Sequence, residues 1–140
     1  MIDENVPPFY VTLKVHDFLL YNCMLHSGAS HNLMPKVIMD QVQLEVTRTY
    51  HDIYTFDSKK VPCYGIIMDL VVTLAQILVK SVVLDIIVID IPPKFGMLLS
   101  RSCCAKLGGS LQMDMSYATI PVYEVEHLKL YREVVFMNTI

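Results

Sequence analysis

The sequence predicts a single all-β domain, and three observations support that fold class. Apolar and polar side chains alternate over residues 9–15, which is the period of a strand that buries one face. Residues 66–74 and 79–91 are rich in valine, isoleucine and leucine, the composition of central strands that are buried on both faces. A length of 140 residues is enough for one domain with its own core and too short for two.

The first elements are expected to form a hairpin. Residues 9–15 and 18–25 are two apolar runs, and the short polar break His16-Asp17 separates them. The second run leads directly into a loop at residues 26–31. This loop connects the hairpin to the rest of the chain.

A short helix is expected after the loop. Ser30 or Asn32 can cap it, and Pro35 would enter near its first turn, where a missing backbone N–H costs no hydrogen bond. The helix is expected to end near Gln43. Its expected inward-facing side chains are all apolar: Val37, Ile38 and Val42.

A long hairpin is expected next. Residues 44–54 are predicted to form a strand that passes through a polar turn near residues 57–60 into a strand beginning at Val61. The tip of such a hairpin is exposed. Gly65 lies in the returning strand, where a missing side chain often marks a bulge or a close backbone contact.

The last part of the domain is expected to contain a strand, a helix and a hairpin. The Pro-Pro pair at residues 92–93 is expected to end the apolar run 79–91. Residues 95–99 are then predicted to form a short apolar strand. The stretch Ser100-Arg101-Ser102 is expected to provide the N-cap of a helix that runs through Leu107 and stops at a Gly-Gly pair. Residues 110–115 are expected to pair with residues 117–122.

The chain is expected to divide into three parts. They are an N-terminal extension at residues 1–7, one domain at residues 8–122 and a C-terminal tail at residues 123–140. Pro121 predicts that the last strand of the domain ends there or lies at an edge. The tail has a mixed charged composition, from which we expect an amphipathic helical turn or disorder.

Composition and charge exclude several classes of function. Apolar residues make up 54% of the chain and charged residues 18%, which excludes a disordered chain and indicates more apolar surface than one small monomer would bury. A dimer is therefore expected. The net charge of -3 and the scattered lysines and arginines provide no extended basic surface, so no nucleic-acid partner is expected.

No membrane partner is expected either. The longest apolar run, residues 65–79, is interrupted by Asp69, Thr73 and Gln76, so it cannot cross a bilayer without burying a charge. The first residues lack the basic and apolar segments of a secretory signal, which favours an intracellular, cytoplasmic location. The four cysteines are accordingly expected to be reduced thiols.

The stretch most informative about function is Met24-Leu25-His26-Ser27-Gly28-Ala29-Ser30. Two apolar residues, one polar residue and then Ser-Gly-Ala indicate a buried strand that ends in a tight turn and presents residue 26 to a cavity. Gly28 can adopt backbone angles that are closed to other residues, and the small residues after it let the backbone approach a ligand or a second chain.

A zinc site built from Cys23, His26, His31 and Cys63 is a weaker alternative for this region. Cys23 and His26 form no Cys-x-x-Cys pair. Successive residues of a strand face opposite sides, so positions three apart do as well. We therefore expect no metal and no cofactor.

Four ordered pieces of the sequence resemble one family. They are residues 25–30, 54–59, 85–90 and 92–102, and the match that rests on them runs from about residue 8 to residue 122. In this order and spacing the chain resembles the retropepsin-like aspartic protease domain of plant long-terminal-repeat retrotransposon polyproteins, of the gypsy type. The resemblance implies an all-β, closed barrel that corresponds to half of a pepsin-type bilobal fold, with one or two short helices.

The resemblance also implies a site and its partners. Such domains work as homodimers, in which each chain supplies half of one active site for an extended peptide or polyprotein substrate. His26 occupies the family's catalytic aspartate position, followed by Ser27 and Gly28. The implied substrate-binding residues come from the loop and from a flap-like hairpin: Ala29, Ser30, Tyr54, Phe56, Asp57 and Ser58.

Two departures from the family pattern bear on activity. His26 replaces the aspartate, and two imidazoles cannot share one proton around a bound water as two carboxyls do, so we expect peptide hydrolysis to be lost or nearly lost. The alternative is a non-catalytic dimerisation or peptide-binding module. Ser100 replaces a family glycine, and the ion pair that family arginines form is expected to be missing at Arg101 or replaced by a hydrogen bond.

Overall fold

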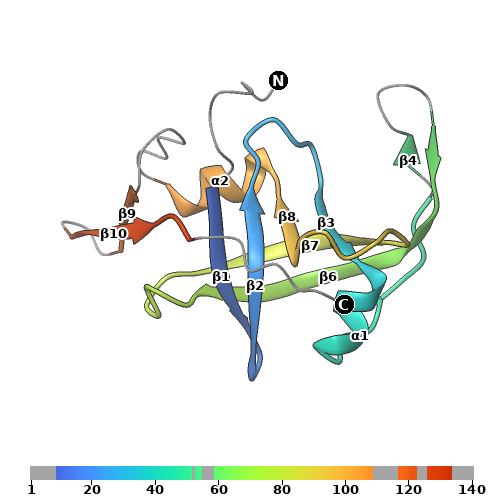
Figure 1. Ribbon diagram of the computed structural model, residues 1–140, viewed down its shortest axis with the longest axis horizontal. Coiled ribbons are helices and arrows are strands. Elements are labelled where there is room, and N and C mark those ends of the chain that lie inside the picture. Colours follow the sequence, from blue (N-terminus) through green and yellow to red (C-terminus); the bar gives the residue numbers. More distant parts are fainter. Residues whose placement is uncertain (1–8, 52, 55–58, 109–116, 123–125, 134–140) are drawn as a thin grey trace.

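The centre of the molecule is a closed barrel of six strands in the order β1-β2-β8-β3-β7-β6 (Figure 1). The computed structural model describes residues 9–51, 53–54, 59–108, 117–122 and 126–133. The barrel confirms the predicted closed β fold. Its strands are β1 (Phe9–Val15), β2 (Phe18–Leu25), β3 (Asn32–Pro35), β6 (Cys63–Leu74), β7 (Ser81–Ile89) and β8 (Met97–Leu99).

The first hairpin forms as predicted. Strand β1 pairs antiparallel with β2, with Phe9 opposite Leu25 and Val15 opposite Phe18. The connecting turn at His16 has a positive φ of 53°, a conformation that is accessible in a tight two-residue turn. The alternation in the sequence is therefore that of a strand with its apolar face in the barrel.

Strands β6 and β7 form the longest antiparallel pair and lie across the other barrel strands in Figure 1. The prediction of burial on both faces holds for the second half of β7, residues 86–89, which is buried throughout. It is wrong for the first half, where Val83 and Asp85 are exposed. The second half differs because Ile87 and Ile89 pack with Ile66 in a second buried cluster, which covers this part of the strand on the face away from the main core.

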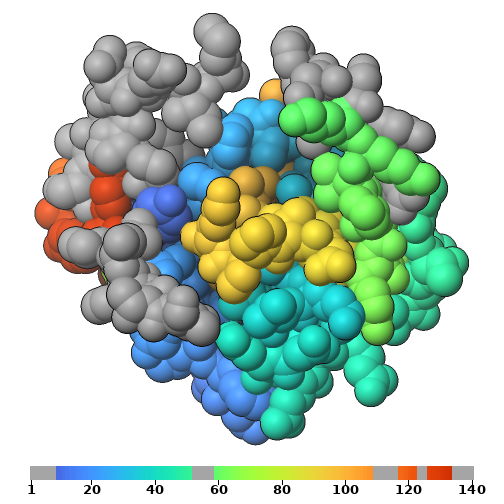
Figure 2. All heavy atoms as spheres, turned by 45° about the vertical axis from the view of Figure 1, so that its right-hand side comes forward, coloured from blue at the N-terminus to red at the C-terminus, as the bar shows by residue number. Residues whose placement is uncertain are grey.

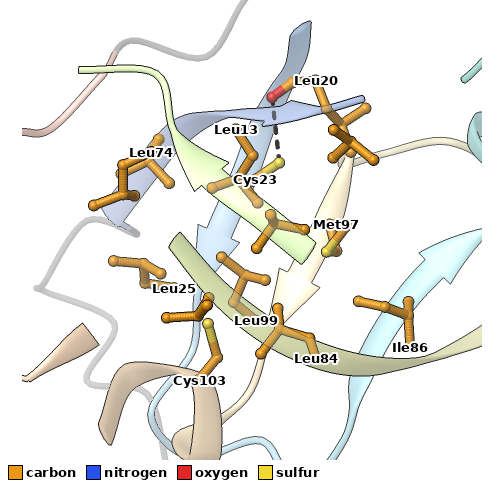
Figure 3. Close-up of a cluster of buried hydrophobic side chains, with 14 of the residues drawn as sticks. Leu13, Leu20, Cys23, Leu25, Leu74, Leu84, Ile86, Met97, Leu99 and Cys103 are labelled. Carbon is orange, nitrogen blue, oxygen red and sulfur yellow. Dashed lines mark hydrogen bonds between the residues drawn. The ribbon is translucent and has the colours of Figure 1, made fainter. Parts of the chain in front are cut away.

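Two parallel pairings, β2 with β8 and β3 with β7, close the barrel. They place Leu25, the last residue of β2, opposite Leu99, the last residue of β8. Figure 3 shows that side chains from five barrel strands and α2 (Arg101–Leu107) converge beneath this point. Those labelled include Leu13, Leu25, Leu74, Leu84, Leu99 and Cys103.

The prediction for residues 30–43 needs a correction. Residues 32–35 form strand β3, because their backbone pairs with β7 and β8, so Asn32 caps no helix. Helix α1 spans Lys36–Gln41 and begins directly after Pro35. On this helix Ile38 is buried as predicted, whereas Val37 is 44% exposed. Val42, the C-cap residue, is buried as predicted.

The long strand predicted at residues 44–54 is also wrong. Among the residues of this range that the structure describes, β4 (Ile53–Tyr54) alone is a strand, and it pairs with β5 (Lys60–Val61), so the predicted hairpin is present with shorter arms. The chain before β4 crosses β6 and makes one isolated bridge, between Arg48 and Ile66. Gly65 permits the crossing, because a Cβ there would lie 2.8 Å from the Val46 side chain. The strand register also shifts at Gly65, as predicted for a bulge.

The predicted helix after β8 forms as α2. Ser100 is its N-cap, and its side-chain oxygen accepts the N–H of Cys103 at 3.4 Å. The helix stops at Gly108, whose φ of 70° and ψ of -173° lie in a region that is open essentially to glycine alone. Neither helix within the described ranges is long and apolar enough to cross a membrane.

The C-terminal region corrects another expectation. Strand β9 (Tyr117–Pro121) pairs with β10 (His127–Tyr131), so this part of the tail is a strand, neither helical nor disordered. The pairing partner predicted for β9, residues 110–115, lies outside the described residues. Leu130 of β10 is fully buried in the main core cluster. The bounds 1–7, 8–122 and 123–140 stay predictions.

The β6–β7 turn holds the β9–β10 hairpin in place. The side-chain amide of Gln76 donates to the carbonyl oxygen of Tyr131 at 2.8 Å and accepts the Tyr131 N–H at 2.7 Å. Lys80 donates from Nζ to the carbonyl oxygen of Pro121 at 3.1 Å. Residues far apart in the sequence therefore fix the hairpin on the end of the barrel.

All four cysteines are free thiols, and Cys23 and Cys103 are buried. Burial raises the pKa of the Cys23 thiol far above its usual range and raises the pKa of Cys103 to about 12. In the unfolded chain both thiols lose their protons near the ordinary value, whereas in the folded protein they keep them. The stability that results is present below pH 9 and is lost as the pH rises toward 12.

Between pH 9 and pH 12 we therefore expect the free energy of unfolding to fall by about 1.4 kcal/mol per pH unit for each of the two thiols. Urea unfolding in a reducing buffer would measure the slope, and Cys103→Ala should remove one thiol's share of it. Ser102→Ala, at the neighbouring helix position, is the matched control. An unchanged slope in Cys103→Ala would contradict the assignment.

Candidate functional site

The loop at residues 26–31 is a tight turn at the end of β2. The His26 N–H donates to the carbonyl oxygen of Leu99 at 2.8 Å, which extends the β2–β8 pairing by one bond. The Ala29 N–H donates to the carbonyl oxygen of His26 at 3.0 Å and closes the turn. The predicted tight turn after the strand is thus confirmed, whereas the strand is buried on one face only, with Leu19 and Tyr21 exposed.

The imidazole of His26 is oriented by its own loop. The Gly28 N–H donates to Nδ1 of His26 at 3.2 Å. Since Nδ1 accepts this bond, the proton of the neutral imidazole is on Nε2. The side chain is half-buried, whereas Ser27 and Gly28 are exposed. The loop thus offers an N–H donor at residue 26, with its acceptor nitrogen already occupied.

Arg101 ties the loop to the start of α2. Its Nε donates to the carbonyl oxygen of Ser27 at 3.0 Å, and its backbone N–H donates to the carbonyl oxygen of Ala29 at 3.0 Å. Of the two outcomes expected for Arg101, the structure therefore shows hydrogen bonds to the loop backbone in place of an ion pair. A guanidinium at this position supports the loop without needing an acidic residue after it.

Asn32 is a supporting residue that the sequence did not reveal. Its Oδ1 accepts the N–H of Ser100 at 2.8 Å, and its Nδ2 donates to the carbonyl oxygen of Asp85 at 3.0 Å. This buried amide therefore joins β3, β7 and the start of α2 directly behind the loop. Its one signal in the sequence is an amide in an otherwise apolar run.

We expect Asn32→Ala to lower the free energy of unfolding by about 1–3 kcal/mol, because it leaves the Ser100 N–H and the Asp85 carbonyl without their partner. Urea unfolding at neutral pH would measure the loss. His31→Ala, which changes the exposed neighbour, is the control and should fall within about 0.5 kcal/mol of the parent chain. Equal stability of the two variants would contradict this role for Asn32.

The predicted substrate-binding residues are placed only in part. Ala29 and Ser30 lie in the loop, with Ser30 exposed, and Tyr54 belongs to β4 of the flap-like hairpin. In Figure 2 light-blue atoms of the β2 end and the loop lie in the upper part of the view, with bright-green atoms of β5 and the start of β6 to their right and gold atoms of the β7–β8 connection below them. Three predicted contacts lie outside the described residues: Phe56, Asp57 and Ser58.

The zinc alternative does not agree with the structure. The thiol of Cys23 points into the core in Figure 3 and donates to the carbonyl oxygen of Leu20 at 3.4 Å. Over the described ranges, no three His, Cys, Asp or Glu side chains gather as metal ligands would. Cys23 is therefore buried in the core, whereas His26 lies in the half-buried loop, as expected for positions three apart at the end of a strand.

Comparisons with known proteins identify the fold. No protein-family model and no curated protein matches the sequence. Among solved structures, the retroviral protease-like domain of Ddi1 from Leishmania major is similar with a TM-score of 0.63 at 15% identity, over 90% of this chain and 96% of that one.

Two further structures agree. EIAV protease complexed with the inhibitor HBY-793 is similar with a TM-score of 0.60 at 14% identity, over 80% of this chain and 99% of that one. A retropepsin-like aspartic protease from Rickettsia conorii is similar with a TM-score of 0.53 at 20% identity, over 76% and 78%. The chain thus has the fold of a retropepsin-like protease domain.

Proposed function

We propose that this chain is an aspartic endopeptidase domain of retrotransposon origin that forms a homodimer and is catalytically impaired. The observation that carries the proposal is the position of His26. It stands at the end of β2 in a retropepsin-like barrel, in a Ser-Gly-Ala turn that is hydrogen-bonded to β8. By lineage the substrate would be an extended segment of a polyprotein.

The exposure of the loop supports a site shared by two chains. Each chain carries one such loop, and its Ser27 and Gly28 are exposed although Leu25, the last residue of the strand before them, is buried. Several large apolar side chains are also exposed, as expected from the composition. They are Leu19, Tyr21, Val37, Tyr64, Val71, Leu78, Val79, Val83, Leu128 and Tyr131.

The hydrogen bond within the loop supports the proposed impairment. Two carboxyls about 3 Å apart share one proton, so that one acts as base on a water and the other as acid on the peptide carbonyl. In neutral His26, Nδ1 already accepts the Gly28 N–H and Nε2 carries the proton. The imidazole therefore presents no base to a water in the groove.

The test is peptide cleavage by the full chain and by His26→Asp. General acid–base catalysis by a positioned group contributes about 10²- to 10⁴-fold, so we expect the aspartate variant to cut apolar peptides at least a hundredfold faster. A hydroxyethylene transition-state mimic should stop it. His26→Asn, which has the aspartate shape without an ionisable group, is the control. Cleavage by the parent chain that the mimic inhibits would refute the impairment.

A second candidate function is a non-catalytic dimerisation or peptide-binding module. It is favoured by the Nε2–H of His26, which is a donor for a peptide carbonyl, and by the β4–β5 hairpin, whose strands suit strand addition. Sedimentation and titration with labelled extended peptides separate the two. A dimer that binds peptides, together with a His26→Asp variant that cuts none, would favour the module.

A further inference from the structure

An open pocket of about 360 Å³ lies beside the candidate site. The loop contributes Ser30 to its rim, and the segment that precedes β4 contributes Arg48. Its apolar wall includes Ile66 and Ile87, and Lys106 of α2 lies on the rim. The volume is within the range of ligand pockets, which hold a few polar groups over an apolar surface.

The cationic groups of this pocket are available to a ligand. The guanidinium of Arg48 is exposed and forms no ion pair or side-chain hydrogen bond within the part of the chain that the structure describes. Lys106 donates one N–H from Nζ to the carbonyl oxygen of Val83 at 2.8 Å, which leaves two N–H groups. Ser30 and Ser102 add hydroxyl groups to the same pocket.

One carboxylate also lines the pocket, that of Asp85. Its Oδ1 accepts the backbone N–H of Asp69 at 2.9 Å, at the bulge of β6. The two cations therefore outnumber the single carboxylate, one of whose oxygens is engaged. The local charge favours a negative ligand.

We propose that this pocket is a specificity site that takes a glutamate or aspartate side chain of a peptide bound at the 26–31 loop. The inference rests on the proposed function, because the peptide must lie along the loop to reach the pocket. Ser30 connects the two, since it belongs to the predicted peptide-binding loop and to the pocket rim. The methylene groups of glutamate would pack on Ile66 and Ile87, and its carboxylate would meet Arg48 and Lys106.

The test uses fluorescein-labelled ten-residue apolar peptides, each with one glutamate at a different position, and the matching glutamine peptides. Anisotropy titrations with the full chain at low salt should show one position at which glutamate binds about three- to fivefold tighter than glutamine. The double variant Arg48→Gln/Lys106→Gln should remove this difference. Asp85→Asn removes the negative charge but keeps an oxygen for the Asp69 N–H, so it should enlarge the difference in affinity between the glutamate and glutamine peptides.

Lys129→Gln, which removes a cation of β10 outside the pocket, is the matched control and should keep the glutamate preference. Equal binding of the glutamate and glutamine peptides at every position would overturn the proposal, and so would a preference that survives the double variant. Peptide cleavage by the His26→Asp variant separates a failure of this pocket assignment from a failure of the proposed function. If it cuts peptides without a glutamate preference, only the pocket assignment fails; if it neither cuts nor binds any peptide, the proposed function fails as well.

Discussion

Gly96→Ala is expected to lower the free energy of unfolding by about 3 kcal/mol or more, because the barrel has no room for a side chain at this position. A Cβ on Gly96 would overlap the carbonyl oxygen of Tyr21 and lie 3.0 Å from Cγ of Leu20. The first of these atoms belongs to the backbone of β2, so no rotamer change relieves the clash. The entry of the chain into β8 must shift instead, and with it the hydrogen bond from the Gly96 N–H to Asn22.

Urea unfolding followed by circular dichroism would measure the effect, or the yield of folded protein where the variant fails to fold. Lys94→Ala adds no atoms at an exposed position two residues earlier, and it should leave the stability within about 0.5 kcal/mol. A Gly96→Ala variant as stable as Lys94→Ala would show that β2 and β8 do not approach each other as closely as described.

Leu99→Ala is the second change with a large expected effect, a loss of about 2–5 kcal/mol in the free energy of unfolding. Leu99 is fully buried, pairs with Leu25 across the parallel strands and lies in the cluster of Figure 3. Its backbone carbonyl also accepts the His26 N–H. The cavity left by the truncation would therefore lie directly beneath the candidate site.

Leu19→Ala is the matched control, because Leu19 lies in β2, the strand that pairs with β8, but is 52% exposed. Its expected loss is about 1 kcal/mol or less, since about half of its surface stays in water and its truncation leaves no closed cavity. Chemical denaturation of both variants at the same pH would give the difference. Similar losses for the two leucines would mean that Leu99 is not in the closed core.

Elements with local signals were predictable from the sequence. The β1–β2 hairpin has its polar break and its alternation, and α2 has a serine cap at Ser100 and a glycine stop at Gly108, so neighbouring residues alone specify them. The loop at residues 26–31 belongs to this group, because small residues after a buried strand suffice to define a turn.

Elements that depend on distant partners were not predictable. Residues 32–35 form a strand because β7 and β8 lie on either side. Residues 44–51 are mostly not strand, because in this described stretch Arg48 alone bridges to β6. Strand β10 likewise exists by pairing with β9. Residues 32–35 and β10 have local preferences for a helix cap and a charged helical turn, and strand pairing overrides both. The stretch before β4 has a local preference for a strand, but it lacks the neighbouring strand that would stabilise one.

The candidate site shows the same division. The sequence placed His26, Ser27 and Gly28 in one turn, but the tautomer of the imidazole depends on a backbone N–H whose direction only the folded loop sets. The support from Asn32 and Arg101 was hidden for a related reason. Both act on backbone groups, and backbone groups carry no sequence signal.

The bond from Arg101 to Ser27 joins residues 74 positions apart in the chain. Together with the His26–Leu99 bond, it makes the geometry of the loop depend on a segment that a ribosome would deliver much later than the loop itself. Closing so long a stretch of chain costs conformational entropy before any contact compensates for it. The loop should therefore acquire its shape late in folding, and a nascent chain that ends before β8 would carry the motif without the site.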